Sequence, residues 1–153
     1  MAGVSIDRDS AGGARDTATT VEEQDPDPAL VHLLERIYRA FNDRDIDALL
    51  SLVGPAFEWH PNPDEPELKV ARTPQDLVAG LRDRWESLPR LRTEVEDIGA
   101  VGERLVADVR HEAVLRGSDT PLERCEVHVW SFRAGRVIRL QEFPSRDAAL
   151  KAL

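Results

Sequence analysis

The chain has 153 residues, of which 41% are apolar and 32% charged, and its formal net charge is −9. This size and composition are typical of one soluble globular domain. An acidic chain without a basic patch is not expected to bind nucleic acid or an anionic membrane surface, because both depend on clustered Lys and Arg. No segment approaches the roughly 20 apolar residues of a membrane span. The first residues lack the apolar core of a signal peptide, so we expect a cytoplasmic protein.

The N-terminal region differs in composition from the rest of the chain. Residues 1–28 hold seven acids and two arginines, and large apolar side chains are nearly absent from residues 1–27. Such a segment cannot bury enough surface to offset the entropy lost on ordering. We therefore predict a disordered acidic tail over residues 1–27 and one folded domain over residues 28–153.

Three helices are predicted in the first half of this domain. Asp27, Asp45 and Thr73 have the side chains that cap helix N-termini, and each precedes a segment with apolar residues at helical spacing. Between the second and third helices, residues 56–60 indicate a short strand and residues 61–72 a loop. The apolar positions are Leu30, Leu33, Leu34, Ile37, Tyr38 and Phe41 in the first helix, Ile46, Leu49, Leu50 and Val53 in the second, and Leu77, Leu81, Trp85 and Leu88 in the third.

The second half of the domain reads as a run of strands. They are predicted at roughly 91–101, 104–116, 122–133 and 136–143, with turns that contain glycine between them. Ser145 then caps a short C-terminal helix. Helices that precede an antiparallel run of strands indicate an α+β fold, in which the helices cover one concave face of a curved sheet.

One predicted strand carries an unusual set of side chains. Glu126, His128, Trp130 and Phe132 share one face, because side chains alternate along a strand. An acid, an imidazole and an indole together favour a polar-lined pocket for a small molecule over a plain core. Cys125 is the only cysteine, so no intrachain disulfide is possible, and we expect it to be a buried small hydrophobic residue.

Several segments match a known family and together cover about residues 29–153. They are YRAFNDRDIDALLSLV, FEWHPNP, TPQDLVAGLRDRW, and HVWSFRAGRVIRLQEF followed by SRDAALKAL. In this order they resemble the SnoaL-like branch of the nuclear transport factor two superfamily. The resemblance implies a cone-shaped roll, in which a curved, mostly antiparallel sheet and three helices enclose a pocket. It also implies a homodimer and, for most members, no metal or other cofactor.

The resemblance supplies candidate catalytic residues. His60 falls where ketosteroid isomerases of the superfamily carry their general base, and His128 falls where they carry the protonated acid of the oxyanion hole. An imidazole suits proton transfer at neutral pH. The tyrosine of that oxyanion hole would fall at Ile37, next to Tyr38. Because all three groups differ, steroid isomerase activity itself is not expected.

A second set of candidates lies on the later strands. Glu142 falls near a carboxylate of the epoxide hydrolases of this superfamily, and Arg110 with Glu112 is the closest match to their Arg-x-Asp pair. Alternation allows either His111 or that pair to face the pocket. Apolar Val109 and Ala113 flank His111 on its side of the strand, so we expect His111 to face inward. Arg110 and Glu112 are then an exposed cross-strand pair.

The sequence also predicts which aromatic residues contact the ligand and whether a metal site is present. Tyr38, Trp85 and Trp130 are expected to contact the ligand, whereas Trp59 should point away from His60 and pack under the helices. His60, His111 and His128 together would suit zinc, but no tight spacing such as HxxxH supports a metal site, and none is predicted.

Three functional hypotheses follow. The first is binding of an apolar small molecule with a carbonyl or hydroxyl group, with proton-transfer chemistry of the isomerase, cyclase or dehydratase type by His60, His128 and Glu142. The second is a non-catalytic module for ligand binding or dimerisation, with its histidines bonded to backbone. The third and weakest is epoxide hydrolysis by Arg110, Glu112 and Glu142.

Overall fold

The computed structural model describes residues 22–153 and shows an α+β fold. The element order follows the predicted one, although the first strand is shorter than expected. The elements are α1 (Pro28–Asn42), α2 (Ile46–Val53), β1 (Glu58–His60), α3 (Pro74–Ser87), β2 (Arg92–Val101), β3 (Arg104–Val114), β4 (Pro121–Arg133), β5 (Arg136–Phe143) and α4 (Arg146–Lys151).

Each helix begins at a side chain that caps it. The carboxylates of Asp27 and Asp45 accept hydrogen bonds from the first turns of α1 and α2, and the hydroxyls of Thr73 and Ser145 do the same for α3 and α4. Gly54 ends α2 with a φ of +79°, in the left-handed region that favours glycine. Local sequence therefore defines the helix starts.

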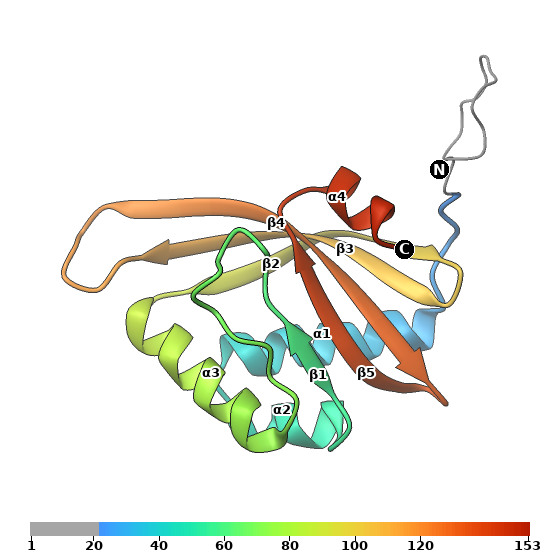
Figure 1. The fold of residues 1–153 in the computed structure, drawn as a ribbon, viewed down its shortest axis with the longest axis horizontal. Coiled ribbons are helices and arrows are strands. Elements are labelled where there is room, and N and C mark those ends of the chain that lie inside the picture. Colours follow the sequence, from blue (N-terminus) through green and yellow to red (C-terminus); the bar gives the residue numbers. More distant parts are fainter. Residues whose placement is uncertain (1–21) are drawn as a thin grey trace, which may run out of the picture.

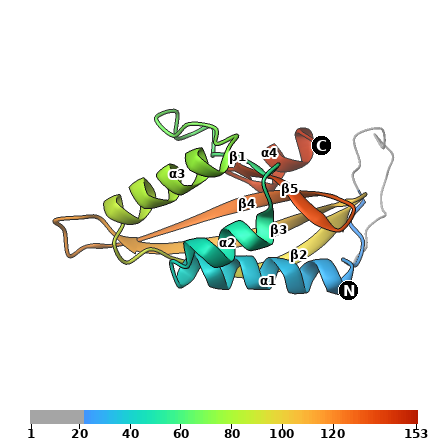
Figure 2. The same cartoon turned by 90° about the horizontal axis from the view of Figure 1, so that it is seen from below.

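The five strands form one curved sheet in the order β1-β5-β4-β3-β2. β1 runs parallel to β5, and the other neighbours are antiparallel. Helices α1, α2 and α3 lie against one face of the sheet, and α4 lies against the other (Figure 1). Seen from below, α3 runs along one side of the covered face and the α1–α2 pair along the other (Figure 2). This is the predicted cone, and the interior lies between the three helices and the sheet.

The outer face of the sheet is covered only in part. Ala149 of α4 packs with Val106, Val127 and Val129 in a small separate cluster. Cys125 is on the same outer face but is exposed, so the expectation that it is buried was wrong. Strand alternation turns the Cys125 side chain away from the main core. It pairs with Arg110 of β3 and does not belong to the cluster that α4 covers.

The predicted tail is described only in part. Residues 1–21 lie outside the described residues, so the prediction of disorder there stays a prediction. Gln24 forms a backbone bridge with Ala100 of β2, and Glu23 lies 3.0 Å from Arg146 of α4. Packing of the chain against the sheet therefore begins before α1. Among the described residues, no helix is long and apolar enough to cross a membrane.

The core position of α1 provides a stability test. Leu34 is completely buried, so Leu34→Ala should lower the free energy of unfolding by about 2–5 kcal/mol, through lost burial and the cavity left behind. Urea denaturation followed by circular dichroism measures this. Leu115→Ala is the matched control, because Leu115 is 49% exposed. An equal effect in the two variants would contradict the described packing.

Candidate functional site

A small cavity lies between the helices and the inner face of the sheet, with a volume of about 60 Å³. Most of its wall is apolar, and its polar side chains come mainly from the sheet. This volume holds only a few water molecules. The lining residues are Ile37, Tyr38, Phe41, Leu49, Val53, Phe57, Trp59, Leu77, Leu81, Arg84, Thr93, His111, His128, Trp130, Leu140 and Glu142.

A larger hollow of about 260 Å³, here called the vestibule, adjoins this inner cavity. Arg84 and His111 line both spaces, so they mark where the two meet. The other vestibule residues are Glu65, Leu88, Leu91, Ala113, Leu115, Leu122, Arg124 and Glu126. The vestibule approaches the lower end of the roughly 300–1,000 Å³ typical of ligand pockets.

The polar centre of the site is the Glu126 carboxylate, which is 3% exposed. Oε1 of this carboxylate lies 2.8 Å from Nε2 of His111 and 3.3 Å from Nε2 of His128. Oε2 accepts a hydrogen bond of 2.8 Å from the Asn62 amide and lies 3.3 Å from Arg124. Strands β3 and β4 and the loop after β1 thus converge on one buried anion.

The second nitrogen of each imidazole is also engaged. Nδ1 of His128 lies 2.7 Å from the Tyr38 hydroxyl, and Nδ1 of His111 lies 2.7 Å from the Thr93 hydroxyl. Trp130 donates its indole N–H to the Tyr38 oxygen at 3.0 Å. Because an indole only donates, the Tyr38 oxygen accepts this bond and keeps a second lone pair.

Burial and hydrogen bonding set the charge states of two groups in this network. Burial alone would raise the pKa of Glu126, but hydrogen bonds from His111, His128 and Asn62 lower it far below its ordinary range. Burial raises the pKa of Tyr38 well above its usual value, despite the hydrogen bond from Trp130. At neutral pH the carboxylate is therefore an anion and the phenol keeps its proton.

Glu142 supplies a second buried carboxylate at the cavity wall. Its Oε1 accepts a hydrogen bond of 3.3 Å from the backbone N–H of Asn62. Its Oε2 has only longer contacts, 3.5 Å to Nη1 of Arg84 and 3.8 Å to Nε2 of His128. Oε2 of Glu142 therefore has an ion-pair contact with Arg84 but no hydrogen bond to the described residues.

His60, the predicted general base, lies on the outer face of the sheet, and its neighbour Trp59 lies on the inner face. Trp59 pairs with Leu140 and His60 with Gln141 in the β1–β5 register, so Trp59 shares the inner face and His60 the outer one. The His60 ring is 2.9 Å from Glu58 and lines neither space. The structure therefore does not bring His60 together with His128 and Glu142.

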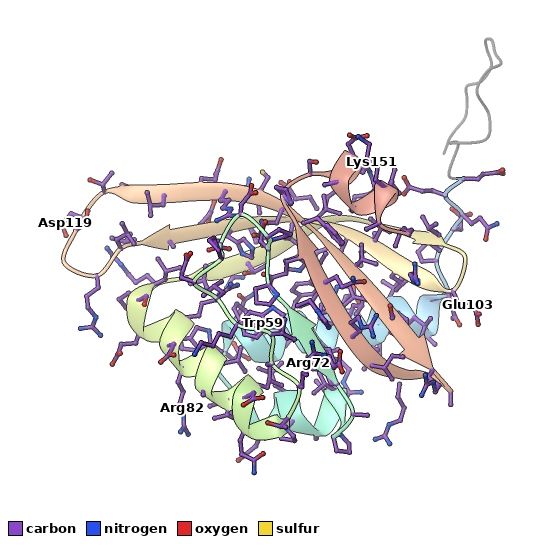
Figure 3. The ribbon with its side chains drawn as sticks, viewed as in Figure 1. Trp59, Arg72, Arg82, Glu103, Asp119 and Lys151 are labelled. Atoms are coloured by element: carbon purple, nitrogen blue, oxygen red, sulfur yellow. The ribbon has the colours of Figure 1, made fainter. Side chains whose placement is uncertain are left out.

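Trp59 does point away from His60 and pack under a helix, as predicted, but it also lines the cavity. Its ring lies against Gly80 of α3, where an added Cβ would come within 3.0 Å, and the Arg84 guanidinium lies 4.9 Å from the ring centroid. Figure 3 shows Trp59 inside the molecule, whereas Arg82 of α3 points outward.

Trp85 lies outside both spaces, contrary to the expectation that it contacts the ligand. It packs in the core, with its ring centroid 5.6 Å from that of Phe41, and the Arg44 guanidinium lies 5.5 Å from its ring centroid. The side of α3 that faces the cavity carries Leu77, Leu81 and Arg84. Trp85 is one residue further, about 100° around the helix, and packs toward α1.

Strand β3 presents His111 inward, as the flanking apolar residues indicated. Arg110 and Glu112 lie on the outer face, where Arg110 is 2.7 Å from Glu94 and 3.6 Å from Glu112. Glu142 is on the inner face. The three residues needed for epoxide hydrolysis therefore do not converge, which excludes that hypothesis.

Three polar residues of the site were missed from the sequence. Asn62 is 1% exposed and Thr93 is 3% exposed. Both lie among polar residues in the sequence, which does not indicate burial. Nothing local indicates that their partners are 51 to 64 positions away. Arg84 did carry a signal, because it follows Leu77 and Leu81 at helical spacing on the apolar side of α3.

Comparisons with known proteins agree with this fold. The family model for the SnoaL-like domain matches residues 34–140, so the chain belongs to the SnoaL-like family, within the superfamily that the sequence predicted. Family and fold are those of a small-molecule-binding SnoaL-like protein. No curated protein matches the sequence significantly.

Solved structures share the fold at low sequence identity. TerC, co-crystallised with polyporic acid, is 23% identical with a TM-score of 0.67, and the alignment covers 80% of this chain and 96% of TerC. An NTF2-like protein of unknown function from Burkholderia pseudomallei K96243 is 19% identical, with a TM-score of 0.69 and coverage of 82% and 97%. A protein from Jannaschia sp. CCS1 described as a SnoaL-like polyketide cyclase is 21% identical, with a TM-score of 0.65 and coverage of 84% and 96%.

The shared carboxylate provides a test of the site geometry. Glu126→Gln places an amide N–H among buried donors, so it should lower the free energy of unfolding by about 1–3 kcal/mol, the penalty for leaving a buried polar group unpaired. Urea denaturation at neutral pH measures the loss. Glu112→Gln makes the same change on the exposed outer face and should have an effect within about 0.5 kcal/mol. Equal stability of the two variants would contradict the network.

Proposed function

We propose that this protein binds an apolar small molecule bearing a carbonyl or hydroxyl group and catalyses proton transfer on it, as in isomerisation, cyclisation or dehydration. The observation that carries the proposal is the position of Glu142. It is a buried carboxylate at the wall of an apolar cavity, and one of its oxygens has no hydrogen bond to the described residues. A carboxylate so placed is suited to accept a proton from a bound substrate.

The neighbouring donors fit the charge that such a step creates. Removal of a proton next to a carbonyl places negative charge on the carbonyl oxygen. Arg84 lines both the cavity and the vestibule, 3.5 Å from Glu142, and the protonated Tyr38 hydroxyl lines the cavity nearby. Fixed donors at the place where charge develops stabilise a transition state more than its ground state.

His128 takes a different role from the one the sequence predicted. Both of its ring nitrogens are engaged, one by Tyr38 and one by Glu126, so in this arrangement it does not offer a free lone pair to a substrate. It instead positions the Tyr38 hydroxyl. Glu142 therefore replaces His60 as the proposed base, and Tyr38 with Arg84 replaces His128 as the proposed donors.

The space available limits the substrate. The inner cavity of about 60 Å³ admits only part of a molecule, and the vestibule of about 260 Å³ holds the remainder. Aromatic walls from Phe57, Trp59 and Trp130 suit a flat apolar ring system. The reactive group would then lie at the junction, next to Arg84 and His111.

The second candidate is a non-catalytic ligand-binding protein. It is favoured by the complete hydrogen bonding of His111 and His128, since structural histidines are satisfied in the same way. The partners are carboxylate and hydroxyl side chains, not the backbone groups that this hypothesis predicted. Turnover of a ligand that co-purifies with the protein separates the two candidates.

Native mass spectrometry of freshly purified protein provides that ligand, and chromatography of its products measures turnover. Glu142→Gln should retain binding but lower turnover by at least about 100-fold, the lower range for loss of a general base. His60→Ala is the control and should keep wild-type turnover, because its ring lies outside both spaces. Wild-type turnover in Glu142→Gln would contradict the role of Glu142, and binding without any turnover would favour the non-catalytic candidate.

A further inference from the structure

The site also holds a constellation that proton transfer by Glu142 does not need. His111, Glu126 and His128 each offer one ligand atom within 4.8 Å of the others, and both imidazoles face Oε1 of Glu126 through Nε2. Two imidazoles and one carboxylate are the protein ligands of many zinc and iron(II) centres. The three residues come from two neighbouring strands at positions 111, 126 and 128, and because this spacing has no helical signature, no metal site was predicted from the sequence.

The partners that orient metal-binding imidazoles are already in place. In metal sites, the ring nitrogen that does not bind the ion donates its N–H to a fixed oxygen. Here Nδ1 of His128 faces the Tyr38 oxygen, and Nδ1 of His111 faces the Thr93 oxygen, each at 2.7 Å. Both hydroxyl oxygens can accept such a bond. The two rings are thereby held with Nε2 directed at the same point.

The carboxylate is also prepared for one ligand bond. Asn62 and Arg124 hold Oε2 of Glu126, whereas Oε1 faces only the two imidazoles. Its separation of 3.3 Å from Nε2 of His128 is close to the spacing of two ligand atoms bound to one zinc ion at about 2.0–2.1 Å. Both imidazoles face Oε1 through Nε2, so an ion bound there would take the place of the Nε2 protons.

The surrounding charge favours a cation. Carboxylate oxygens of Glu65, Glu126 and Glu142 lie within 4.8 Å of one another, and the nearby cations are Arg84 and Arg124. Among these five groups the negative charges outnumber the positive ones, and a divalent ion would reverse that balance. His111 and Glu126 also line the vestibule, which gives an ion a route of entry and leaves a coordination position open to a ligand.

We propose that His111, Glu126 and His128 form a binding site for one divalent transition-metal ion of the zinc type, with an open coordination position toward the vestibule. This site goes beyond the proposed proton transfer and does not depend on it. A bound ion would add a Lewis acid next to the substrate carbonyl.

Isothermal titration of tag-free, chelator-treated protein with ZnSO₄ tests the site. We expect one ion per chain in the wild type. His111→Ala/His128→Ala should weaken zinc affinity by at least about 100-fold, more than the loss of an outer partner alone would cause. His32→Ala/His60→Ala removes the other two of the four histidines and should keep the wild-type affinity. No stoichiometric binding to the wild type, or equal losses in the two double variants, would overturn the proposal.

Titration of the wild type with CoCl₂ removes the dependence on variants that could fail to fold. Co²⁺ held by imidazole and carboxylate ligands with an open position should show the intense visible absorption of a four- or five-coordinate ion. The weak spectrum of the hydrated ion alone would overturn the proposal. Neither measurement uses turnover, so its failure leaves the role of Glu142 untouched.

Discussion

The site depends on one buried anion, the carboxylate of Glu126 on the inner face of β4. A buried charge is costly unless hydrogen bonds replace its water. Here the replacement comes from His111 of β3, His128 of β4 and Asn62 of the loop after β1. Because Asn62 and His111 lie 64 and 15 positions from Glu126, the anion can be satisfied only when the sheet is paired in its observed register and the loop is closed over it.

The same network joins the sheet to the first helix. His128 bonds Tyr38 of α1, and His111 bonds Thr93 of β2. The backbone of Thr93 in turn exchanges two hydrogen bonds with the Asn42 side chain at the end of α1, at 2.8 and 2.9 Å. One continuous set of polar contacts therefore runs from α1 through the cavity wall to Glu126. It fixes the polar end of an otherwise apolar cavity, and it gives the imidazoles the orientation on which the proposed metal site depends.

The sequence predicted what local chemistry decides. Capping residues and apolar periodicity gave the helices, and the apolar residues beside His111 gave its inward orientation, with Arg110 and Glu112 on the outer face. The orientation of β1 was not predictable in the same way, because a three-residue strand carries too little alternation to fix its face, and a shift of one residue exchanges Trp59 and His60. Glu126 was placed on the pocket face, but its role required knowing that Asn62 and His111 reach it across 64 and 15 positions.

The central claim is that Glu126 holds two oriented imidazoles at the cavity, and nuclear magnetic resonance of the histidine side chains tests it most directly. Two-bond and three-bond ¹H–¹⁵N correlations on metal-free protein at neutral pH distinguish the two neutral tautomers and the imidazolium. The described contacts predict that His111 and His128 each carry a proton on Nε2, facing Oε1 of Glu126. A His128 ring that carries its proton only on Nδ1, or that exchanges freely between tautomers like an exposed histidine, would contradict the account.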